Sequence, residues 1–572
     1  MAFQLSPGVN VTEKDITLIV PAVATSPAAF AGPFAWGPAN EITTIASEAD
    51  LVKTFGAPTD SGYYSKFWFT ASNFLAYGNN LKVVRTVNTT DKNASNGTAV
   101  QITNREYYDT LTWTGNGTSG SNNWYAAYPG TLGNSLRVVV LDSGSGVHTT
   151  DTAASDEYAD YIQYFDSIPG TSQSAINLGG TNVKDEIHIL VIDANGTFTG
   201  VKGTILEKFS FLSKGKNCLK EDGNTAYYRD VINNESEYLW VGDALNSTWD
   251  ANVTSATSFT TLTNSYSSVV LSGGVNHADS NMSDNAIGAY YSTYFSNADT
   301  LDIGMMIAGP LSVSAANAII GVADTRRDCI AFVSPGNTKT KTESEKLTEV
   351  LAYRSSLTSS SYGVMDSGYK TQYDKYNDAY RSIPLCGDIA GCCARTDDVQ
   401  QPWYSPAGFS RGTILNTIKL DYNPNKTHRD ELYKKGINPV VSFDGSGVVL
   451  FGDKTLLQKP SAFDRINVRR LFIVLEKAIA KASQFVLFEF NDEFTRSQFR
   501  LLVEPFLRGV QADRGITDFL VVCDGSNNTG QVIDSNSFVA DIYIKPNRSI
   551  NFIQLNFIAT PTGLSFEEVV GA

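Results

Sequence analysis

The sequence predicts a multidomain protein of the α/β and α+β classes, with a discontinuous α/β core domain, an inserted mostly-β outer domain and a C-terminal α+β domain. The chain has 572 residues, which is too long for one hydrophobic core. Strand and helix patterns alternate over 21–86 and again over 285–425, which indicates one shared parallel sheet. Strand patterns dominate over 87–284, so we expect that range to be looped out of the core.

The C-terminal domain is predicted over 426–563, and its most regular part begins with a long helix. The helix sequence INVRRLFIVLEKAIAKAS follows Asp464, which can cap it. Its apolar residues recur at helical spacing, at Ile466, Leu471, Val474, Leu475, Ala478 and Ile479. We expect Arg469 and Arg470 to lie on the side that faces water.

The rest of this domain is predicted as a second helix and a small sheet. An apolar run at 485–490 predicts a buried strand. Asn491 and Asp492 then open a helix, which Pro505 is expected to kink or end. Three strand-like runs follow, at 519–523, 539–545 and 550–559.

Both ends of the chain are predicted as extended arms, over 1–20 and 564–572. In the first arm, Val9, Val11 and Glu13 alternate with the residues between them, which predicts one short strand with no hairpin partner nearby. A lone strand must add to the edge of a sheet, either in its own fold or in a neighbouring chain.

The elements of the two β-containing regions follow from their apolar patterns and turn residues. In the discontinuous domain we expect helices over 48–55, 63–77, 286–295, 312–322 and 342–355, and strands over 81–85, 303–308 and 329–333. In the inserted domain we expect strands over 136–141, 186–192, 238–241 and 269–271. Two further segments of the insertion, 158–165 and 206–212, are short and ambiguous helix candidates.

Charge is unevenly distributed along the chain, which carries a formal net charge of −15. Residues 87–300 contain 10 basic and 23 acidic residues, whereas residues 426–572 contain 17 of each. The first region is predicted to be an acidic, outward-facing shell, and the second is suited to packing against copies of itself or a partner. Neither has the basic excess that general nucleic-acid binding requires.

The sequence also argues against membrane insertion and secretion. No run of about 18 apolar residues is present, so we expect no membrane-spanning segment. The first residues lack the basic and apolar regions of a secretory signal. The six cysteines, Cys218, Cys329, Cys386, Cys392, Cys393 and Cys523, form no CxxC pair and are predicted to be buried free thiols.

No catalytic, cofactor or metal site is predicted. The sequence contains no Walker-type loop, no HExxH and no GxSxG elbow. Its four histidines, His148, His188, His277 and His428, share no ligand spacing. The run from Asp193 to Gly196 resembles the start of a calcium loop, but Lys202 stands where the closing Glu belongs, so we expect a hairpin turn. The tyrosine-rich run 369–381 is interpreted as an interdomain or intersubunit surface.

Several motifs, in order, resemble the contractile tail sheath proteins of contractile-tailed (myovirus) bacteriophages. They are SPGV at 6–9, GPFAWGPANEI at 32–42, FLAYGNNLKVVR at 74–85, YPGTLGNSLRV at 128–138, YKTQYDKYNDAYRSIPLCGDIAGCCARTD at 369–397, SPAGFSRGTILN at 405–416, FGDKT at 451–455, FDRINVRRLF at 463–472 and NRSINFIQLNF at 547–557. The resemblance is strong over 20–86 and 300–565 and weak over 87–300.

The resemblance implies a structural subunit and not an enzyme. Proteins of this family form stacked hexameric discs around an inner tail tube and contract to drive the tube through the host envelope during genome delivery. The implied partners are other copies of the chain, the inner tail tube protein, and the baseplate and tail terminator proteins, without nucleic acid and without membrane insertion. The implied location is the virion tail, assembled in the host cytoplasm.

The resemblance also implies where copies would join. The two arms would add strands to the C-terminal sheets of neighbouring subunits, through Val9, Val11 and Glu13 in one arm and Leu564, Phe566 and Glu568 in the other. Chain near 15–21 and 559–563 would act as hinges during contraction. Arg496, Arg500 and Arg508 are candidate tube-facing residues, and ordinary solvated arginines are the alternative.

Two other functions stay open at this point. A cell-surface or capsid-type structural protein would also polymerise, but into flat arrays and not tubes. An α/β hydrolase with an unrecognised site would need a nucleophile beside one of the four histidines.

Overall fold

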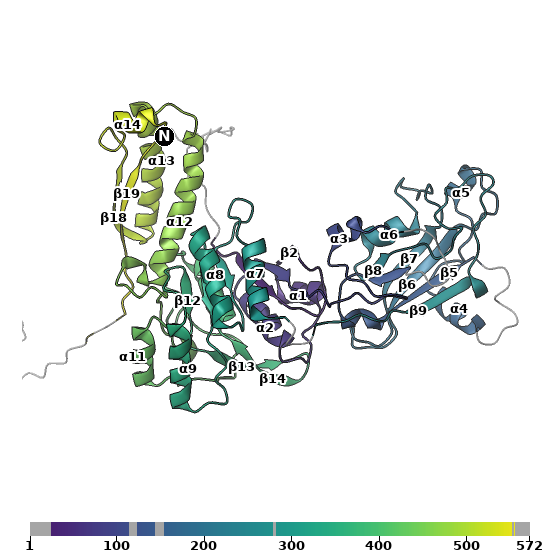
Figure 1. Ribbon diagram of the computed structural model, residues 1–572, viewed down its shortest axis with the longest axis horizontal. Coiled ribbons are helices and arrows are strands. Elements are labelled where there is room, and N and C mark those ends of the chain that lie inside the picture. The colour runs from purple at the N-terminus through teal and green to yellow at the C-terminus, as the bar shows by residue number, and fades with distance from the viewer. Residues whose placement is uncertain (1–24, 114–122, 144–153, 278–281, 552–553, 555–572) are drawn as a thin grey trace, which may run out of the picture. The chain divides into compact units, whose positions relative to one another are not determined.

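The computed structural model describes residues 25–113, 123–143, 154–277, 282–551 and 554 (Figure 1). The chain divides into two compact units, which are described separately below. The larger unit comprises Ala24–Val399 and Pro406–Asp464, and the smaller contains Gln400–Ser405 and the chain from Arg465 onward.

The larger unit is organised around a six-stranded sheet with the strand order β12-β11-β10-β1-β3-β2. Its strands are β1 (Ala28–Gly32), β2 (Ile42–Ile45), β3 (Leu81–Arg85), β10 (Met305–Ile307), β11 (Ile330–Val333) and β12 (Gly363–Met365). All neighbours pair in parallel except β2, which runs antiparallel to β3. The strand predicted at 81–85 is therefore confirmed, as is its place in one sheet with the strands that follow residue 300.

Several helices of the larger unit accompany this sheet. They are α1 (Glu48–Phe55), α2 (Tyr64–Leu75), α7 (Asp284–Tyr294), α8 (Val313–Arg326), α9 (Glu343–Ser355) and α10 (Cys386–Val399). The Ser47 side chain caps α1 by accepting a hydrogen bond from Asp50 N, and Thr342 and Glu345 form a capping box at the start of α9. These positions agree with the predicted helices to within a few residues.

The segment Pro406–Asp464 belongs to the larger unit, which corrects the predicted start of the C-terminal domain at residue 426. A three-stranded sheet joins β13 (Tyr369–Asp374), β14 (Ala379–Pro384) and β15 (Lys419–Leu420). Helix α11 (Lys426–Lys434) and the hairpin of β16 (Val440–Phe443) and β17 (Gly447–Leu450) follow. Asn438 N donates to Met365 O, and Leu456 N donates to Gly363 O. These bonds fasten the segment to β12, so the division falls after Asp464.

The region between β3 and α7 forms two further sheets. The four-stranded sheet β7-β6-β5-β9 is antiparallel, and a second sheet pairs β4 with β8. The strands are β4 (Trp124–Ala126), β5 (Leu136–Asp142), β6 (Glu186–Asp193), β7 (Thr204–Ser213), β8 (Leu239–Val241) and β9 (Tyr266–Val270). Short helices accompany them: α3 (Arg105–Thr110), η1 (Thr131–Ser135), α4 (Ala154–Ile162), α5 (Gln173–Asn177), α6 (Tyr228–Glu235) and η2 (Thr263–Ser265).

Three expectations for this region have definite outcomes. The ambiguous segment 158–165 overlaps helix α4, but 206–212 lies within strand β7 because it pairs with β6. The predicted hairpin turn after Asp193 is confirmed, since it connects antiparallel strands β6 and β7. The Asp193 carboxylate accepts hydrogen bonds from Thr197 N, Phe198 N and Thr199 N, so backbone donors hold it where a calcium ion was considered.

The smaller unit packs two long helices beside a two-stranded ribbon (Figure 1). The helices are α12 (Ile466–Ser483) and α13 (Glu493–Ala512), the ribbon is β18 (Ile516–Val522) with β19 (Asp541–Pro546), and α14 (Gly530–Asp534) lies between these strands in the chain. Trp403, from the short stretch Gln400–Ser405, packs against the same core, and its Nε1 donates to Asp513 O at 3.1 Å.

Several predictions for this unit need correction. Helix α12 is confirmed, but its N-cap is Arg465 and not Asp464, which ends a 3-10 turn (η3, Ala462–Asp464). Residues 485–490 are not a buried strand: a 3-10 turn, η4 (Gln484–Val486), leads into irregular chain there. Pro505 lies inside α13, which continues to Ala512. Ile550 and Asn551 are not in a strand, and most of the predicted strand 550–559 lies outside the described residues.

Candidate assembly surface

The β18–β19 ribbon has one covered face and one open face. Alternate residues of the ribbon pack against α12 and α13, namely Phe519, Val521, Ile542 and Ile544. The residues between them point away from the helices, so Leu520 and Tyr543, which are register partners, are both exposed. The exposed Asp518 and Lys545 form a second cross-strand pair on this face, with Nζ and Oδ2 2.8 Å apart.

The ribbon also has open edges. Within the described residues, β18 and β19 pair only with each other. A two-stranded sheet leaves backbone donors and acceptors along both outer edges, and it becomes more stable when another strand is added. An added strand would pair with these edge donors and acceptors. The sequence analysis predicted that the C-terminal sheet accepts strands in this way.

The residues predicted to donate strands cannot be placed. Val9, Val11, Glu13, Leu564, Phe566 and Glu568 all lie outside the described residues. Their pairing with the ribbon therefore stays a prediction.

The three candidate tube-facing arginines do not share one surface. Arg496 and Arg500, one helical turn apart on α13, are both partly buried beside the core. Arg496 donates to Asn491 Oδ1 at 3.1 Å, and the nearby arginines contribute to lowering the pKa of Asp524, after the hydrogen bonds from Ser526. Arg508 instead lies on the outward face of α13, paired with Glu504 at 3.6 Å.

Two other arginines depart from the prediction. Arg469 and Arg470 on α12 are buried, although they were expected to face water. The long aliphatic part of an arginine side chain can pack in a core while its guanidinium finds polar partners, which is why helical spacing alone misplaced them.

Sequence analysis missed an exposed apolar surface. Between α12 and α13, the side chains of Phe485, Leu487, Phe488 and Phe490 are exposed, and so are Phe494 and Leu501 on the outward face of α13. The run was predicted as a buried strand because it is apolar. The signal against burial was Glu489 inside the run, together with the helix-opening Asn491 and Asp492 directly after it.

The three histidines in the described part of the chain form no shared site. His188 stacks on Phe165 and its Nδ1 accepts a hydrogen bond from Phe211 N, and burial lowers its pKa. His277 Nδ1 lies 2.9 Å from Asp91 Oδ2, and His428 Nδ1 contacts the Tyr422 hydroxyl at 3.1 Å. His148 lies outside the described residues. Each of the other three histidines contacts its own separate set of neighbours.

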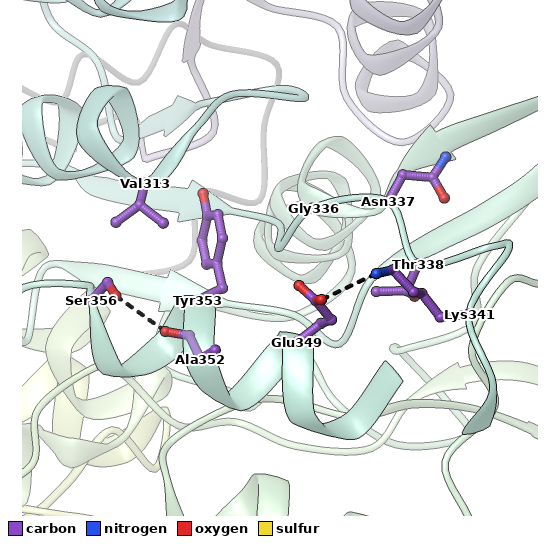
Figure 2. A pocket seen from close by; sticks show the side chains of 9 residues that line it. All are labelled: Val313, Gly336, Asn337, Thr338, Lys341, Glu349, Ala352, Tyr353 and Ser356. Carbon is purple, nitrogen blue, oxygen red and sulfur yellow. Dashed lines mark hydrogen bonds and ion pairs between the residues drawn. The ribbon is translucent and has the colours of Figure 1, made fainter. Parts of the chain in front are cut away.

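A cavity of about 300 Å³ lies at the carboxyl end of β11, bounded by α8 and α9 (Figure 2). Its charged groups, Lys341 and Glu349, face one another at 3.3 Å, and the Tyr353 hydroxyl donates to Leu311 O. Both charged side chains are exposed to solvent and pair with each other.

The described residues contain no group of three or more His, Cys, Asp or Glu side chains arranged to hold a metal ion. None of the helices in the described part of the chain is both long and apolar enough to span a membrane. All six cysteines are buried and free, as predicted.

Comparison with known proteins identifies the family. Residues 25–86 match the N-terminal region of tail sheath protein Gp18 domain III, residues 288–456 match the phage tail sheath protein central domain, and residues 458–560 match the phage tail sheath C-terminal domain. The tail sheath protein of Vibrio phage KVP40 is 34% identical, aligned over 99% of this chain and 100% of its own. That of Enterobacteria phage T4 is 33% identical, over 99% of both chains. The chain belongs to the phage tail sheath protein family.

Solved structures support the same fold at lower identity. The sheath tail protein of Listeria innocua aligns with a TM-score of 0.53 and 12% identity, over 92% of this chain and 96% of that chain. The helical sheath of the anti-feeding prophage in its contracted state aligns with a TM-score of 0.51 and 13% identity, over 98% and 100%. The three family matches leave residues 87–287 outside their ranges, which is the region where the sequence resemblance is weak.

Proposed function

We propose that this chain is the structural subunit of a contractile phage tail sheath. It polymerises as stacked hexameric discs around an inner tail tube and contracts to drive that tube through the host envelope during genome delivery. The observation that carries this proposal is the identity of 33–34% to two named tail sheath proteins over nearly the whole of each chain. The role is mechanical and not enzymatic.

Strand exchange between copies holds the sheath together in this proposal. The N-terminal arm, through Val9, Val11 and Glu13, and the C-terminal arm, through Leu564, Phe566 and Glu568, add to the ribbons of neighbouring copies. The open edges of β18 and β19 among the described residues support this arrangement. Each added strand forms backbone hydrogen bonds whatever its side chains are, so the connection survives when the subunits rotate.

Contraction then requires no nucleotide. The extended sheath is metastable while the baseplate and tube hold it, and release lets the subunits move as bodies into a shorter and wider polymer. Hinges near 15–21 and 559–563 absorb the rotation while the exchanged strands stay paired. Partners of this assembly are the inner tail tube, the baseplate and the tail terminator, and it is built in the host cytoplasm as part of the virion tail.

Arg496 and Arg500 are the better tube-facing candidates, because they share one flank of α13. Charge reversal of both, with Arg508→Glu as the matched single change on the outward face, tests this. Sedimentation of sheath with purified tubes is expected to fall for the double variant and to change little for Arg508→Glu. Equal binding by all three chains would remove this assignment.

Electron microscopy of the purified chain tests the main proposal. We expect striated hollow tubes, whereas flat arrays would favour a surface-layer or capsid-type protein. A chain that lacks residues 1–15 is expected to remain folded and monomeric. Two double variants of the N-terminal arm distinguish the effect of strand register from the effect of added negative charge. Val9→Asp/Val11→Asp should block the formation of tubes. Asn10→Asp/Thr12→Asp adds the same charge at the alternate positions and should not block it. Tubes built by the truncated chain would refute the arm assignment.

A further inference from the structure

The helical hairpin of the smaller unit presents an apolar patch, which we define as Phe485, Leu487, Phe488, Phe490, Phe494 and Leu501. Their exposed fractions are 70%, 62%, 105%, 84%, 68% and 72%. Phe494 and Leu501 are two turns apart on the outward face of α13, and the other four lie in the segment just before its N-cap, Asp492. We propose that a second copy of this chain covers the patch in the assembled sheath, an inference that rests on the proposed function.

The size of the patch matches a protein–protein contact. A buried aromatic side chain removes about 150–250 Å² from water, so these exposed fractions leave roughly 800 Å² of apolar surface. A typical soluble monomer exposes a largest apolar patch of about 300–600 Å². A stable interface buries about 800 Å² on each partner. The patch alone therefore supplies the area that one side of a stable contact needs.

One residue of the apolar patch has an unfavourable backbone conformation. Phe488 adopts φ 71°, in the left-handed region that is unfavourable for a bulky residue. The turn is fixed by local hydrogen bonds, from Leu487 N to Gln484 O, from Glu489 N to Val486 O and from Asp492 N to Phe490 O. A glycine or asparagine would fit this turn more easily. Strain that places Phe488 in water indicates a function outside the isolated chain.

Charge favours a copy of the same chain over a charged partner. The region 426–572 carries 17 basic and 17 acidic residues, so it does not repel its own kind. On the outward face of α13, Arg508 pairs with Glu504, and this pair is internally neutral. Attraction here comes from apolar burial, which a polymer of identical chains provides at high local concentration. This contact uses side chains, and so it is separate from backbone strand exchange.

Thiol labelling tests which partner covers the patch. All six native cysteines are buried, so Phe488→Cys introduces the one accessible thiol among them. We expect it to react rapidly with a maleimide in the monomer and at least tenfold more slowly in tubes that the chain forms without tail-tube protein. Val201→Cys, at another exposed apolar position on the insertion, is the matched control and should react equally in both states.

Each contrary outcome has a distinct meaning. Protection already in the monomer would show that the chain's own terminal segment covers the patch, and protection only after addition of tube protein would assign it to the tube. Equal reactivity in monomer and polymer, or equal protection of both cysteines, would also overturn the inference. A wild-type chain that never forms tubes would instead contradict the proposed function.

A glycine substitution gives an independent test, because it should weaken assembly without lowering the stability of the monomer. Phe488→Gly relieves the left-handed backbone, so the midpoint of thermal unfolding of the monomer should rise or stay unchanged. The concentration needed for polymerisation should rise at least tenfold, because the centre of the patch is lost. A variant that is equally stable and assembles like wild type would refute the proposal, and Val201→Gly controls for loss of exposed apolar area.

Discussion

Lys370 Nζ lies 2.9 Å from Asp388 Oδ1, and neither side chain is exposed to solvent. The pair connects β13 to α10. The Tyr77 hydroxyl from the end of α2 donates to the same carboxylate oxygen at 2.9 Å, and Lys370 Nζ also donates to Leu415 O. Burial raises the pKa of Asp388 and lowers the pKa of Lys370, and each partner opposes the shift of the other. Three elements of the larger unit are thus joined at one enclosed charge pair.

Removal of the lysine should destabilise the fold strongly. Lys370→Met leaves Asp388 buried without its cation, which we expect to lower the free energy of unfolding by about 3–5 kcal/mol. Lys53→Met, which breaks an exposed pair with Glu237, is the control and should cost less than about 1 kcal/mol. Urea denaturation measures both, and similar losses in the two variants would contradict this account.

The stability of the chain should fall as pH rises toward 8, because of Asp366. This carboxyl accepts hydrogen bonds from Ser334 Oγ at 2.6 Å and Gly368 N at 2.8 Å, yet burial raises its pKa to about 8. An unfolded aspartate has a pKa near 3.9. Between those values the folded state holds the proton and the unfolded state does not, so the contribution present at low pH is lost as pH rises.

Asp366→Asn isolates this contribution, because the amide stays neutral at every pH. The stability of Asp366→Asn relative to wild type should increase by more than about 2 kcal/mol between pH 5 and pH 9. The exposed Asp518→Asn variant should show no such trend. Chemical denaturation across that pH range decides the matter, and a constant difference between Asp366→Asn and wild type would show that Asp366 ionises normally.

Elements with regular apolar patterns and clear end signals were predictable from the sequence. The helix over 48–55 and the strand over 81–85 coincide with α1 and β3 because their apolar spacing and flanking glycines or polar caps agree with their tertiary environment. The segment 206–212 was ambiguous because its apolar residues fit either period. Pairing with β6, which is distant information, decided that it is a strand.

The assembly surface was less accessible to sequence reasoning. Residues 485–490 have the composition of a buried strand, and composition cannot reveal that nothing within the described chain covers them. Arg469 and Arg470 were predicted to be exposed because they are charged, but both are buried. The charge of an arginine does not indicate how much of its aliphatic stem can be buried. A surface that becomes buried only between copies leaves no distinct pattern within one copy.

Close packing between α10 and α2 gives a prediction about a single methyl group. A Cβ added at Gly391 would lie 2.4 Å from Tyr77 Cδ2 and 3.0 Å from Tyr77 Cβ. Gly391→Ala should therefore lower the free energy of unfolding by about 1–3 kcal/mol. Gly321→Ala, in α8 with nothing within 4 Å of the added atom, should be neutral or stabilising by up to about 1 kcal/mol. If thermal unfolding ranks the two variants the other way, the helix contact is looser than described.

The junction between the main sheet and the insertion depends on Arg85. This residue ends β3, is fully buried, and donates to the carbonyl oxygens of Phe34, Gly37 and Pro129 at 2.9, 2.7 and 2.6 Å. Pro129 belongs to the insertion and the other two follow β1, so one guanidinium ties both parts. Burial lowers the pKa of Arg85 to about 10, which leaves it charged at neutral pH.

Arg85→Lys keeps the charge but cannot reach three carbonyls with the same planar fork. We expect it to lower the free energy of unfolding by about 2–4 kcal/mol, because at least one buried carbonyl loses its donor. Amide hydrogen exchange should accelerate around 127–135 and 34–39 more than in the ribbon β18–β19 of the smaller unit. Arg137→Lys is the control, because Arg137 is a partly buried arginine of β5 that donates to the Tyr161 hydroxyl, and it should leave exchange at the junction unchanged. Uniform acceleration across both units in Arg85→Lys would mean that Arg85 stabilises the fold globally and does not specifically fasten the insertion to the sheet.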